Sequence, residues 1–467
     1  MTQKPSGGIT IPQGTVHRTI GLLQRSLHQL GADIAPREVE RIGVIVHRAM
    51  SMQQRSFHTP EHIFDLSDPS DAHSTLAALF HDTVYYQVDE GFLDTIEDLL
   101  APFIISEKGV VRLQDKIPEK NRPFYCTAAV FGFAPGDAPS PFAGLNEFLS
   151  ALVMNLLLKE IVPDRDLLVA TAAIEMTVPF RGPDKTGCRP PEHLEARILR
   201  MNEEFHLGLT KEEIKKAVVT AVRFANRDVH NFAEESPAQF LDNTWKLLPE
   251  SNPDLRVQGL YSIGSYSIAL MKMEKFLVTL EPENVFNSFN GYPEEKEYRH
   301  LQEKVATNLK TSGEYLGVKM ISAGLLKALA DLSGGDAPMS YFMGDLETAD
   351  DFSRLSSHLP ENPSFFHLKK KETTALFKLL EEGRSSASRF DLQNSPLSVF
   401  VYRCLTPEER KSCIHAAREF IAGDLTAEAF LAVPPAPLTE AVARAAAVMA
   451  FTRREELIRI ADSFAGA

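Results

Sequence analysis

The chain has 467 residues, of which 44% are hydrophobic and 24% charged, the ordinary balance of a globular protein with a sizeable core. Its 63 acidic residues outnumber its 49 basic ones, which argues against a general nucleic-acid binder or a protein that docks on anionic membranes. The four cysteines form no CxxC pair, and no apolar run approaches about 18 residues, so neither a disulfide framework nor a membrane span is expected. We therefore expect a cytoplasmic protein.

Helical spacing of apolar residues dominates the first hundred residues. It predicts helices over 15–31, 36–54, 59–66, 70–86 and 92–100. Thr59 and Ser70 are the expected N-caps of the third and fourth of these helices. Residues 101–141 are rich in Pro and Gly, which predicts a surface loop with one short strand over 125–133.

The rest of the chain repeats the helical pattern. Helices are expected over 142–160, 166–177, 191–203, 211–232, 237–248, 255–280, 293–332, 369–383, 406–421, 427–431 and 436–464. Strands are nearly absent from this prediction, so the fold class is all-α. We divide the chain into residues 15–250, which hold the candidate site, and a helical region over 251–467 of unknown role. Amphipathic helices of the second region are expected to pack on the first region or on a second subunit, as in a homo-oligomer.

His81 and Asp82 are neighbours in a stretch that is otherwise apolar on nearly every face. Such a helix is normally buried, and buried polar side chains need partners. An imidazole nitrogen beside a carboxylate oxygen is a suitable start for a metal site. The alternative is a buried histidine with local hydrogen bonds and an Asp82 that faces water, and the dipeptide alone favours this alternative.

His58 and His62 are four residues apart, at the start of the helix expected over 59–66. This spacing places them near one helix face, with His58 at the entrance and His62 one turn further in. Two neutral imidazoles in such a position suit a metal ion or a phosphate better than a hydrophobic core. For His58 the alternative is an exposed position in a loop.

Asp228 lies along the edge of the apolar stripe of the helix expected over 211–232. Aspartate is almost never fully buried without a partner, so this position also indicates a binding role. The alternative is an ion pair on the helix surface with Arg223 or Arg227.

Together these residues resemble the HD superfamily of metal-dependent phosphohydrolases. The pattern consists of His58 and His62 four residues apart, the pair His81-Asp82 and the much later Asp228. The segment Phe57-His58-Thr59 with His62 is similar to the Tyr-His-Asn-x-x-His segment of cyclic nucleotide phosphodiesterases and small bacterial HD proteins. The resemblance covers roughly residues 17–232.

The resemblance implies an HD-type hydrolase domain over residues 15–250. In it, one divalent metal ion (Mn, Fe, Zn, Ni, Co or Mg) would be bound by His62, His81, Asp82 and Asp228. His58 would donate a proton to the leaving oxygen, and Asp82 would also help to orient the attacking water. The substrate would be a nucleotide or another phosphate-containing small molecule.

Three basic residues are candidates for binding the substrate phosphate. Arg55 lies just before His58, and Arg181 and Lys185 lie in the loop 179–191. The alternative for the two loop residues is that they are solvated charges without a ligand.

The chain departs from the two-metal members of the superfamily, because the histidines between the HD pair and the last aspartate, His193 and His206, lack tight spacing. Glu175 is a candidate replacement as ligand or base. Two other functions therefore stay open. One is a catalytically inactive HD-fold protein that binds a nucleotide or a partner, and the other is a di-iron oxygenase, which would need two further ligands.

Overall fold

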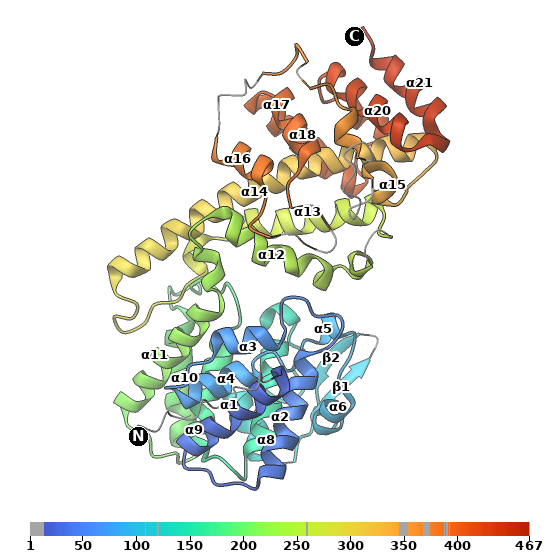
Figure 1. The fold of residues 1–467 in the computed structure, drawn as a ribbon. Helices are drawn as coiled ribbons and strands as arrows, with labels where there is room; N and C mark the ends of the chain where they lie inside the picture. Colours follow the sequence, from blue (N-terminus) through green and yellow to red (C-terminus); the bar gives the residue numbers. More distant parts are fainter. Residues whose placement is uncertain are drawn as a thin grey trace, which may run out of the picture. The chain divides into compact units, whose positions relative to one another are not determined.

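The computed structural model describes residues 14–107, 109–118, 121–257, 260–344, 354–361, 363–367, 374–386, 388, 391 and 393–466. Contacts divide the chain into two compact units (Figure 1). Unit 1 runs to His230 and includes Glu283–Arg299, and unit 2 holds Asn231–Pro282 and the residues from His300 onward. The division observed by contacts thus falls after His230, whereas the sequence suggested residue 250.

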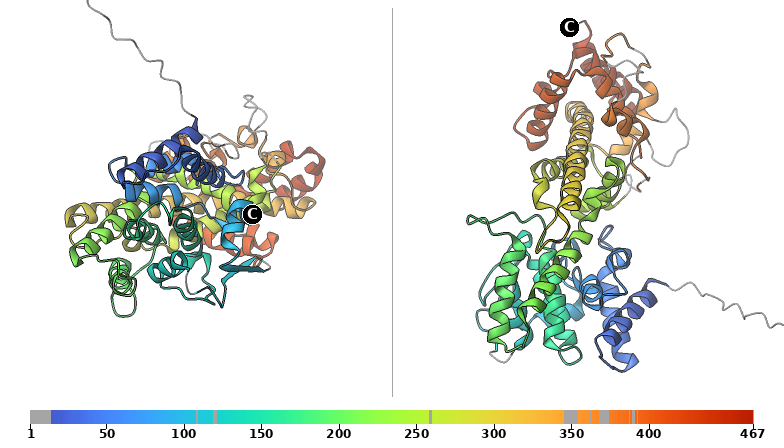
Figure 2. Two further views of the ribbon diagram at one scale, coloured as in Figure 1. Left: turned by 90° about the horizontal axis from the view of Figure 1, so that it is seen from below. Right: turned by 90° about the vertical axis from the view of Figure 1, so that its left-hand side faces the viewer.

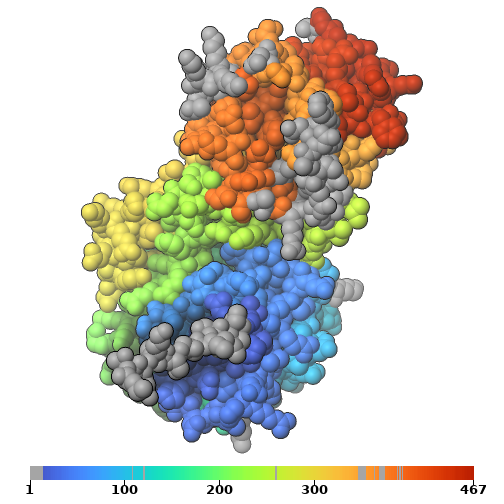
Figure 3. Space-filling view, in the orientation of Figure 1, coloured from blue at the N-terminus to red at the C-terminus, as the bar shows by residue number. Residues whose placement is uncertain are grey.

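Unit 1 is a helical body with one small hairpin. Its helices are α1 (Thr15–Gln29), α2 (Pro36–Met50), α3 (Pro60–Leu66), α4 (Ala72–Phe80), α5 (Tyr86–Asp89), α6 (Asp94–Leu100), α7 (Arg122–Phe131), α8 (Leu145–Leu158), α9 (Asp164–Met176), α10 (Pro190–Glu204) and α11 (Lys211–Asp228). Strands β1 (Ile104–Glu107) and β2 (Val110–Leu113) pair antiparallel, with Ile104 opposite Leu113. In Figure 3 the first hundred residues, coloured blue, form most of the visible surface of this unit.

The centre of unit 1 is formed by helices that are apolar on almost every face. In α8, and in α9 from Leu167 onward, nearly every side chain is buried, as the absence of a polar face predicts. Helix α4 packs on α9 and on α1, and α11 packs on α9, α4 and α3. The short helices α3 and α4 are therefore held between the buried core and α11, which fixes the residues at their ends.

The strand predicted over 125–133 is wrong, because these residues form α7. Asn121 caps this helix by accepting a hydrogen bond from the Phe124 amide, and Pro123 occupies its first turn. Gly132, with φ of 75°, ends it in the left-handed conformation. These terminal signals decide the structure of a short apolar run whose periodicity fits both helix and strand.

Helix α4 differs from its prediction at both ends. Its N-cap is Asp71, whose side chain accepts from the His73 and Ser74 amides, and not Ser70. The helix ends at Phe80 and not near residue 86, so His81 is its C-cap residue and Asp82 lies beyond it. The pair His81-Asp82 therefore lies at a helix end, where neighbouring side chains are free to converge on one point.

Unit 2 is also helical. Its helices are α12 (Pro237–Ser251), α13 (Ile263–Thr279), α14 (Glu295–Ser333, from residue 300 onward), α15 (Met339–Met343), α16 (Ala375–Glu382), α17 (Pro396–Cys404), α18 (Pro407–Ala422), α19 (Ala427–Leu431), α20 (Ala436–Met449) and α21 (Arg454–Phe464). The single helix expected over 436–464 is two helices, α20 and α21, separated by a short 3-10 turn at Phe451–Arg453. Residues 258–259 and 369–373 of two further predicted helices lie outside the described residues.

The long helix α14 is the element on which unit 2 is assembled (Figure 2). Its glycines allow other helices to approach closely. A Cβ atom at Gly317 would lie 2.7 Å from Ile414 in α18, and one at Gly324 would lie 3.0 Å from the Phe430 ring in α19. A larger residue at either position would separate α14 from these helices.

The described residues thus form an all-α protein, as the sequence predicts, with one two-stranded sheet that the sequence analysis did not predict. Among the helices of the described residues, none is both long enough and apolar enough to cross a membrane.

Gly144, which precedes α8, has φ of 93°, and a Cβ atom there would lie 2.7 Å from Val178 Cγ2. Gly208 has a similar φ of 70°, but a Cβ atom there would have no neighbour within 4 Å. We expect Gly144→Ala to destabilise the protein by about 1–3 kcal/mol more than Gly208→Ala, because only the former adds overpacking to backbone strain. Urea unfolding of the two variants measures this difference, and equal midpoints would contradict it.

Candidate metal centre

Three helices of unit 1 bring four ligand-type side chains together. His62 lies in α3, His81 and Asp82 follow α4, and Asp228 is the last residue of α11. His62 Nε2 lies 3.1 Å from Asp228 Oδ1 and 3.7 Å from Asp82 Oδ2. His81 Nε2 lies 2.8 Å from Asp82 Oδ2 and 3.7 Å from Asp228 Oδ1. We call this group the His/Asp centre.

One ring nitrogen of His81 is fixed by the backbone and the other is directed at the centre. Nδ1 donates to the Ala78 carbonyl at 3.1 Å, and the ring packs edge-on against Phe224. Nε2 is buried and has no aligned hydrogen-bond partner in the described part of the chain, although Asp82 Oδ2 is 2.8 Å away. A histidine bound to a metal is oriented in the same way, with its second nitrogen tied to a carbonyl or carboxylate.

The spacing of the donor atoms fits a divalent ion. Ligands about 2.1 Å from a common ion lie about 3.0–3.4 Å apart at octahedral or tetrahedral angles. The four contacts of the centre span 2.8–3.7 Å, so shifts of a few tenths of an ångström suffice. The donor atoms of His62, His81 and Asp82 all lie within 4.8 Å of one another, and Asp228 approaches both imidazoles. Two imidazoles and two carboxylates suit Zn, Fe, Mn, Co or Ni.

The charges within the centre stabilise one another. Burial alone would lower the pKa of His81, but the carboxylates of Asp82 and Asp228 outweigh it and raise this pKa well above its usual value. Burial likewise opposes ionisation of Asp82 and Asp228, yet the neighbouring imidazoles hold the pKa of both carboxyls below the usual range. The carboxylates are therefore ionised at neutral pH, as metal ligands must be, and a bound cation would displace the proton from His81.

The ion pair considered as an alternative for Asp228 does not form. Arg227 donates to the Leu66 carbonyl and lies 3.3 Å from Asp68, while Arg223 lies over the Tyr292 ring. Arg227 thus ties the end of α11 to the end of α3. This contact helps to hold Asp228 against His62.

His58 lies beside the centre and not within its ligand group. Its ring is 5.7 Å from the His62 ring and 4.9 Å from the Tyr85 ring, measured between centroids. It is half-buried, and it contributes to the lowered pKa of the Asp82 carboxyl.

Arg55 is placed differently from the expectation that it binds phosphate. Its side chain is fully buried, and its Nε and Nη2 atoms donate to Asp89 at 2.8 and 2.6 Å. Nη1 donates to the Asp82 carbonyl at 2.6 Å and contacts Met50 Sδ. The guanidinium thus holds the backbone of a site residue and has no exposed surface for a substrate.

Glu175 is buried under two arginines and is no part of the centre. Arg181 pairs with its Oε1 at 2.6 Å and also donates to its carbonyl, and Arg197 pairs with the same carboxylate oxygen. The Arg181 side chain remains 28% exposed, so it still offers positive charge to solvent. Lys185 is exposed in its loop.

Glu147, near the start of α8, is not identified as a candidate site residue by the sequence analysis. Its Oε2 atom is buried and has no hydrogen-bond partner among the described residues. The pKa of this carboxyl is raised to about 7, chiefly by burial and in part by the charges of Asp82 and Asp228, while a backbone hydrogen bond and Arg181 oppose the rise. Glu147 is thus close enough to interact with both the centre and Arg181. A lone glutamate in an apolar helix was the available signal, because such a residue needs a partner.

Comparisons of the chain with protein-family models, with curated proteins and with solved structures found no match. The chemistry of the centre therefore rests on its own donor atoms and their spacing.

Replacing Arg55 should destabilise unit 1 strongly. Arg55→Ala leaves the buried Asp89 carboxylate without its partner, which costs about 3–5 kcal/mol. The control is Arg41→Ala, which removes the exposed pair with Glu38 and should cost at most about 1 kcal/mol. Urea unfolding of chelator-treated protein measures both, and a loss for Arg55→Ala no larger than that of the control would contradict the proposed support of Asp82.

The stability of the metal-free protein should depend on pH through Glu147. Its folded pKa of about 7 lies above the ordinary 4.5, so the protonated form is favoured by folding. The contribution of this carboxyl to the free energy of unfolding is complete below about pH 4.5 and is lost as pH rises through about 7. Glu147→Gln removes this loss, so the melting temperature of the variant relative to wild type should be higher at pH 8 than at pH 5. A difference that does not change with pH would contradict this account.

Proposed function

We propose that unit 1 is a metal-dependent phosphohydrolase of the HD superfamily that acts on a nucleotide or another phosphate ester. The observation that supports this most directly is the convergence of four donor atoms from α3, α4 and α11, with the buried His81 Nε2 aimed among them. In the described part of the chain this is the one group of its kind, so we propose a single ion. The di-iron oxygenase would need a second set of ligands.

The residues around the centre would have different roles in hydrolysis. A divalent ion held by His62, His81, Asp82 and Asp228 would lower the pKa of a coordinated water and polarise a phosphoryl oxygen. The carboxylates of Asp82 and Asp228, ionised at neutral pH, can accept a hydrogen bond from the attacking water and so orient it. The Arg55 contact to the Asp82 carbonyl keeps this carboxylate in place.

His58 is the residue proposed to protonate the leaving oxygen. Its ring lies next to that of His62, with 5.7 Å between the centroids, and we propose that it faces the substrate from there. A positioned acid of this kind contributes roughly 10²–10⁴ in rate. Arg181, fixed by Glu175 and partly exposed, is proposed to attract the substrate phosphate.

The protonation state of Glu147 affects how well a negatively charged substrate can bind near the centre. Its carboxyl would repel a substrate phosphate when ionised, and its pKa of about 7 allows it to be neutral below that pH. A cation bound at the centre would favour its ionised form. Turnover is therefore expected to depend on Glu147 as well as on His58.

The test measures metal content and phosphate release on the same preparations. Wild-type protein supplied with Mn²⁺ or Zn²⁺ should retain about one equivalent of metal and release phosphate from a panel of nucleoside phosphates. His62→Ala should lose both properties, because it removes a ligand. His58→Ala should keep the metal but lose roughly 10²–10⁴ in turnover. His17→Ala, which changes an exposed histidine on α1, is the control and should alter neither.

Two results would remove the proposal. One is a protein that binds no metal under any of these conditions, which favours the catalytically inactive interpretation. The other is His62→Ala with unchanged metal content and turnover. Retained turnover in His58→Ala would remove only the acid role of that residue.

A further inference from the structure

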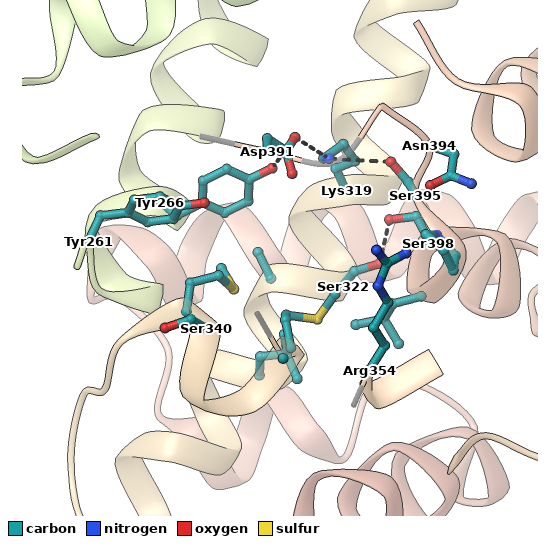
Figure 4. A pocket seen from close by; sticks show the side chains of 17 residues that line it. Tyr261, Tyr266, Lys319, Ser322, Ser340, Arg354, Asp391, Asn394, Ser395 and Ser398 are labelled. Atoms are coloured by element: carbon teal, nitrogen blue, oxygen red, sulfur yellow. Dashed lines mark hydrogen bonds and ion pairs between the residues drawn. The ribbon is translucent and has the colours of Figure 1, made fainter. Parts of the chain in front are cut away.

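Unit 2 contains a pocket of its own, at the first turn of α17 (Figure 4). One side carries the polar groups Lys319, Ser322, Arg354, Ser395 and Ser398. The other side is formed largely by Leu326, Met339, Met343 and two tyrosines. All of these residues belong to unit 2, so the pocket is distinct from the His/Asp centre.

Lys319 provides a fixed positive charge inside this pocket. Its side chain is only 7% exposed, and Nζ donates to Asp391 Oδ2 at 2.8 Å and to Ser395 Oγ at 3.3 Å. An ammonium group has three protons, so one remains beyond these two bonds. The lysine is thus held in place by the protein, and its third proton is left for the face of Trp245, whose ring centroid lies 5.1 Å from Nζ, or for a ligand.

Asp391 offsets only part of the positive charge at this end of the pocket, because its single negative charge faces both Lys319 and Arg384. Its Oδ2 atom accepts from Lys319 and from the Tyr266 hydroxyl and also faces Arg384. Burial would raise the pKa of Asp391, but Lys319 and Arg384 outweigh burial and hold this pKa below its usual value. Asp391 therefore acts as an ionised anchor that positions the lysine.

The first turn of α17 adds backbone donors. Ser395 is its N-cap residue, but its hydroxyl forms no cap and instead contacts Lys319 and Tyr315. The amides of Leu397 and Ser398 have no hydrogen-bond partner among the described residues. Free amides at a helix start, next to a buried ammonium group, form an environment that favours an anion.

Hydroxyl groups and a guanidinium complete the polar side. Ser322 and Ser398 share a hydrogen bond of 2.9 Å, and both are at least nine-tenths buried. Arg354 extends toward these two serines in Figure 4. Because the single hydroxyl proton of Ser322 is donated to the Val318 carbonyl, Ser398 is the donor in this pair. Ser398 can therefore turn its proton to a ligand while Ser322 keeps a partner.

The apolar side is suited to a ring. Tyr261 and Tyr266 are stacked, with centroids 5.8 Å apart and an interplanar angle of 26°. Burial raises the pKa of the Tyr266 hydroxyl far above its usual value, so it remains a donor to Asp391 at every relevant pH. Tyrosine faces and methionine side chains accommodate flat apolar groups well.

We propose that this pocket binds a small phosphate monoester with an aromatic or heterocyclic body. The phosphate would lie between Lys319, the Ser322–Ser398 pair and the first turn of α17, and the ring would lie against Met339, Met343 and the tyrosines. Lys319 on α14 and the Ser398 hydroxyl and two amides on α17 come from two helices, and the three oxygens of a tetrahedral phosphate can meet donors so arranged better than the two coplanar oxygens of a carboxylate.

The experiment uses phenylphosphonate, which carries the phosphate-like group and the ring but has no ester bond to be hydrolysed. Isothermal titration of the full-length, chelator-treated protein should show saturable binding that is tighter than that of inorganic phosphate or of benzoate. Ser398→Ala should weaken it about tenfold or more, because it removes a buried donor to a charged group. Ser412→Ala, on the exposed face of α18, is the matched control and should leave binding unchanged.

Lys319→Met should abolish binding, but this change also deprives Asp391 of its partner, so the melting temperature of each variant is measured alongside. Ser398→Ala, with Ser322 still hydrogen-bonded, keeps the test valid if Lys319→Met fails to fold. His62→Ala separates the two sites and should bind phenylphosphonate as wild type does, whatever becomes of the proposed hydrolase. No binding at millimolar probe, tighter binding of benzoate, binding unaffected by Ser398→Ala, or binding lost in His62→Ala would each overturn the proposal.

Discussion

The contact between α11 and the two short helices α3 and α4 is the constraint on which the candidate site depends. It carries Asp228 to within 3.1 Å of His62 Nε2, although the two residues are 166 positions apart. Without it, His81 and Asp82 would be a buried pair with no counterpart. The interaction is secured on both sides, because Arg227 bonds the end of α3 and Arg55 bonds the Asp82 backbone.

Much of this could be predicted from the sequence, because it depends on local pattern. The all-α class follows from apolar periodicity, and capping residues such as Thr210 mark helix starts that the structure contains. The four residues of the His/Asp centre were also identifiable, since histidine and aspartate are unusual among apolar neighbours. In each case the information lies within a few residues of the position concerned.

The rest depends on partners that are distant in sequence. Arg55 beside His58 suggested a phosphate ligand, but the guanidinium is used by Asp89, 34 positions away. Glu175 is likewise occupied by Arg197, which the sequence does not place near it. Glu147 gains its unusual pKa only from burial and from charges on other helices. The strand expected over 125–133 is wrong for a different reason. The periodicity of so short an apolar run fits helix and strand alike, and the capping residues Asn121 and Gly132 decide that it is a helix.

The long separation of His62 and Asp228 along the sequence of unit 1 has a consequence for its folding if both hold one cation, as proposed. His62 comes early in this unit and Asp228 ends its last long helix, so a cation joined to both would act as a cross-link that closes a loop of 166 residues. Closing so long a loop removes conformational entropy from the unfolded chain, and any ligand that binds only the folded form shifts the folding equilibrium. The ion would then stabilise the folded state in addition to its chemical role, and chelation would lower the stability of the whole unit.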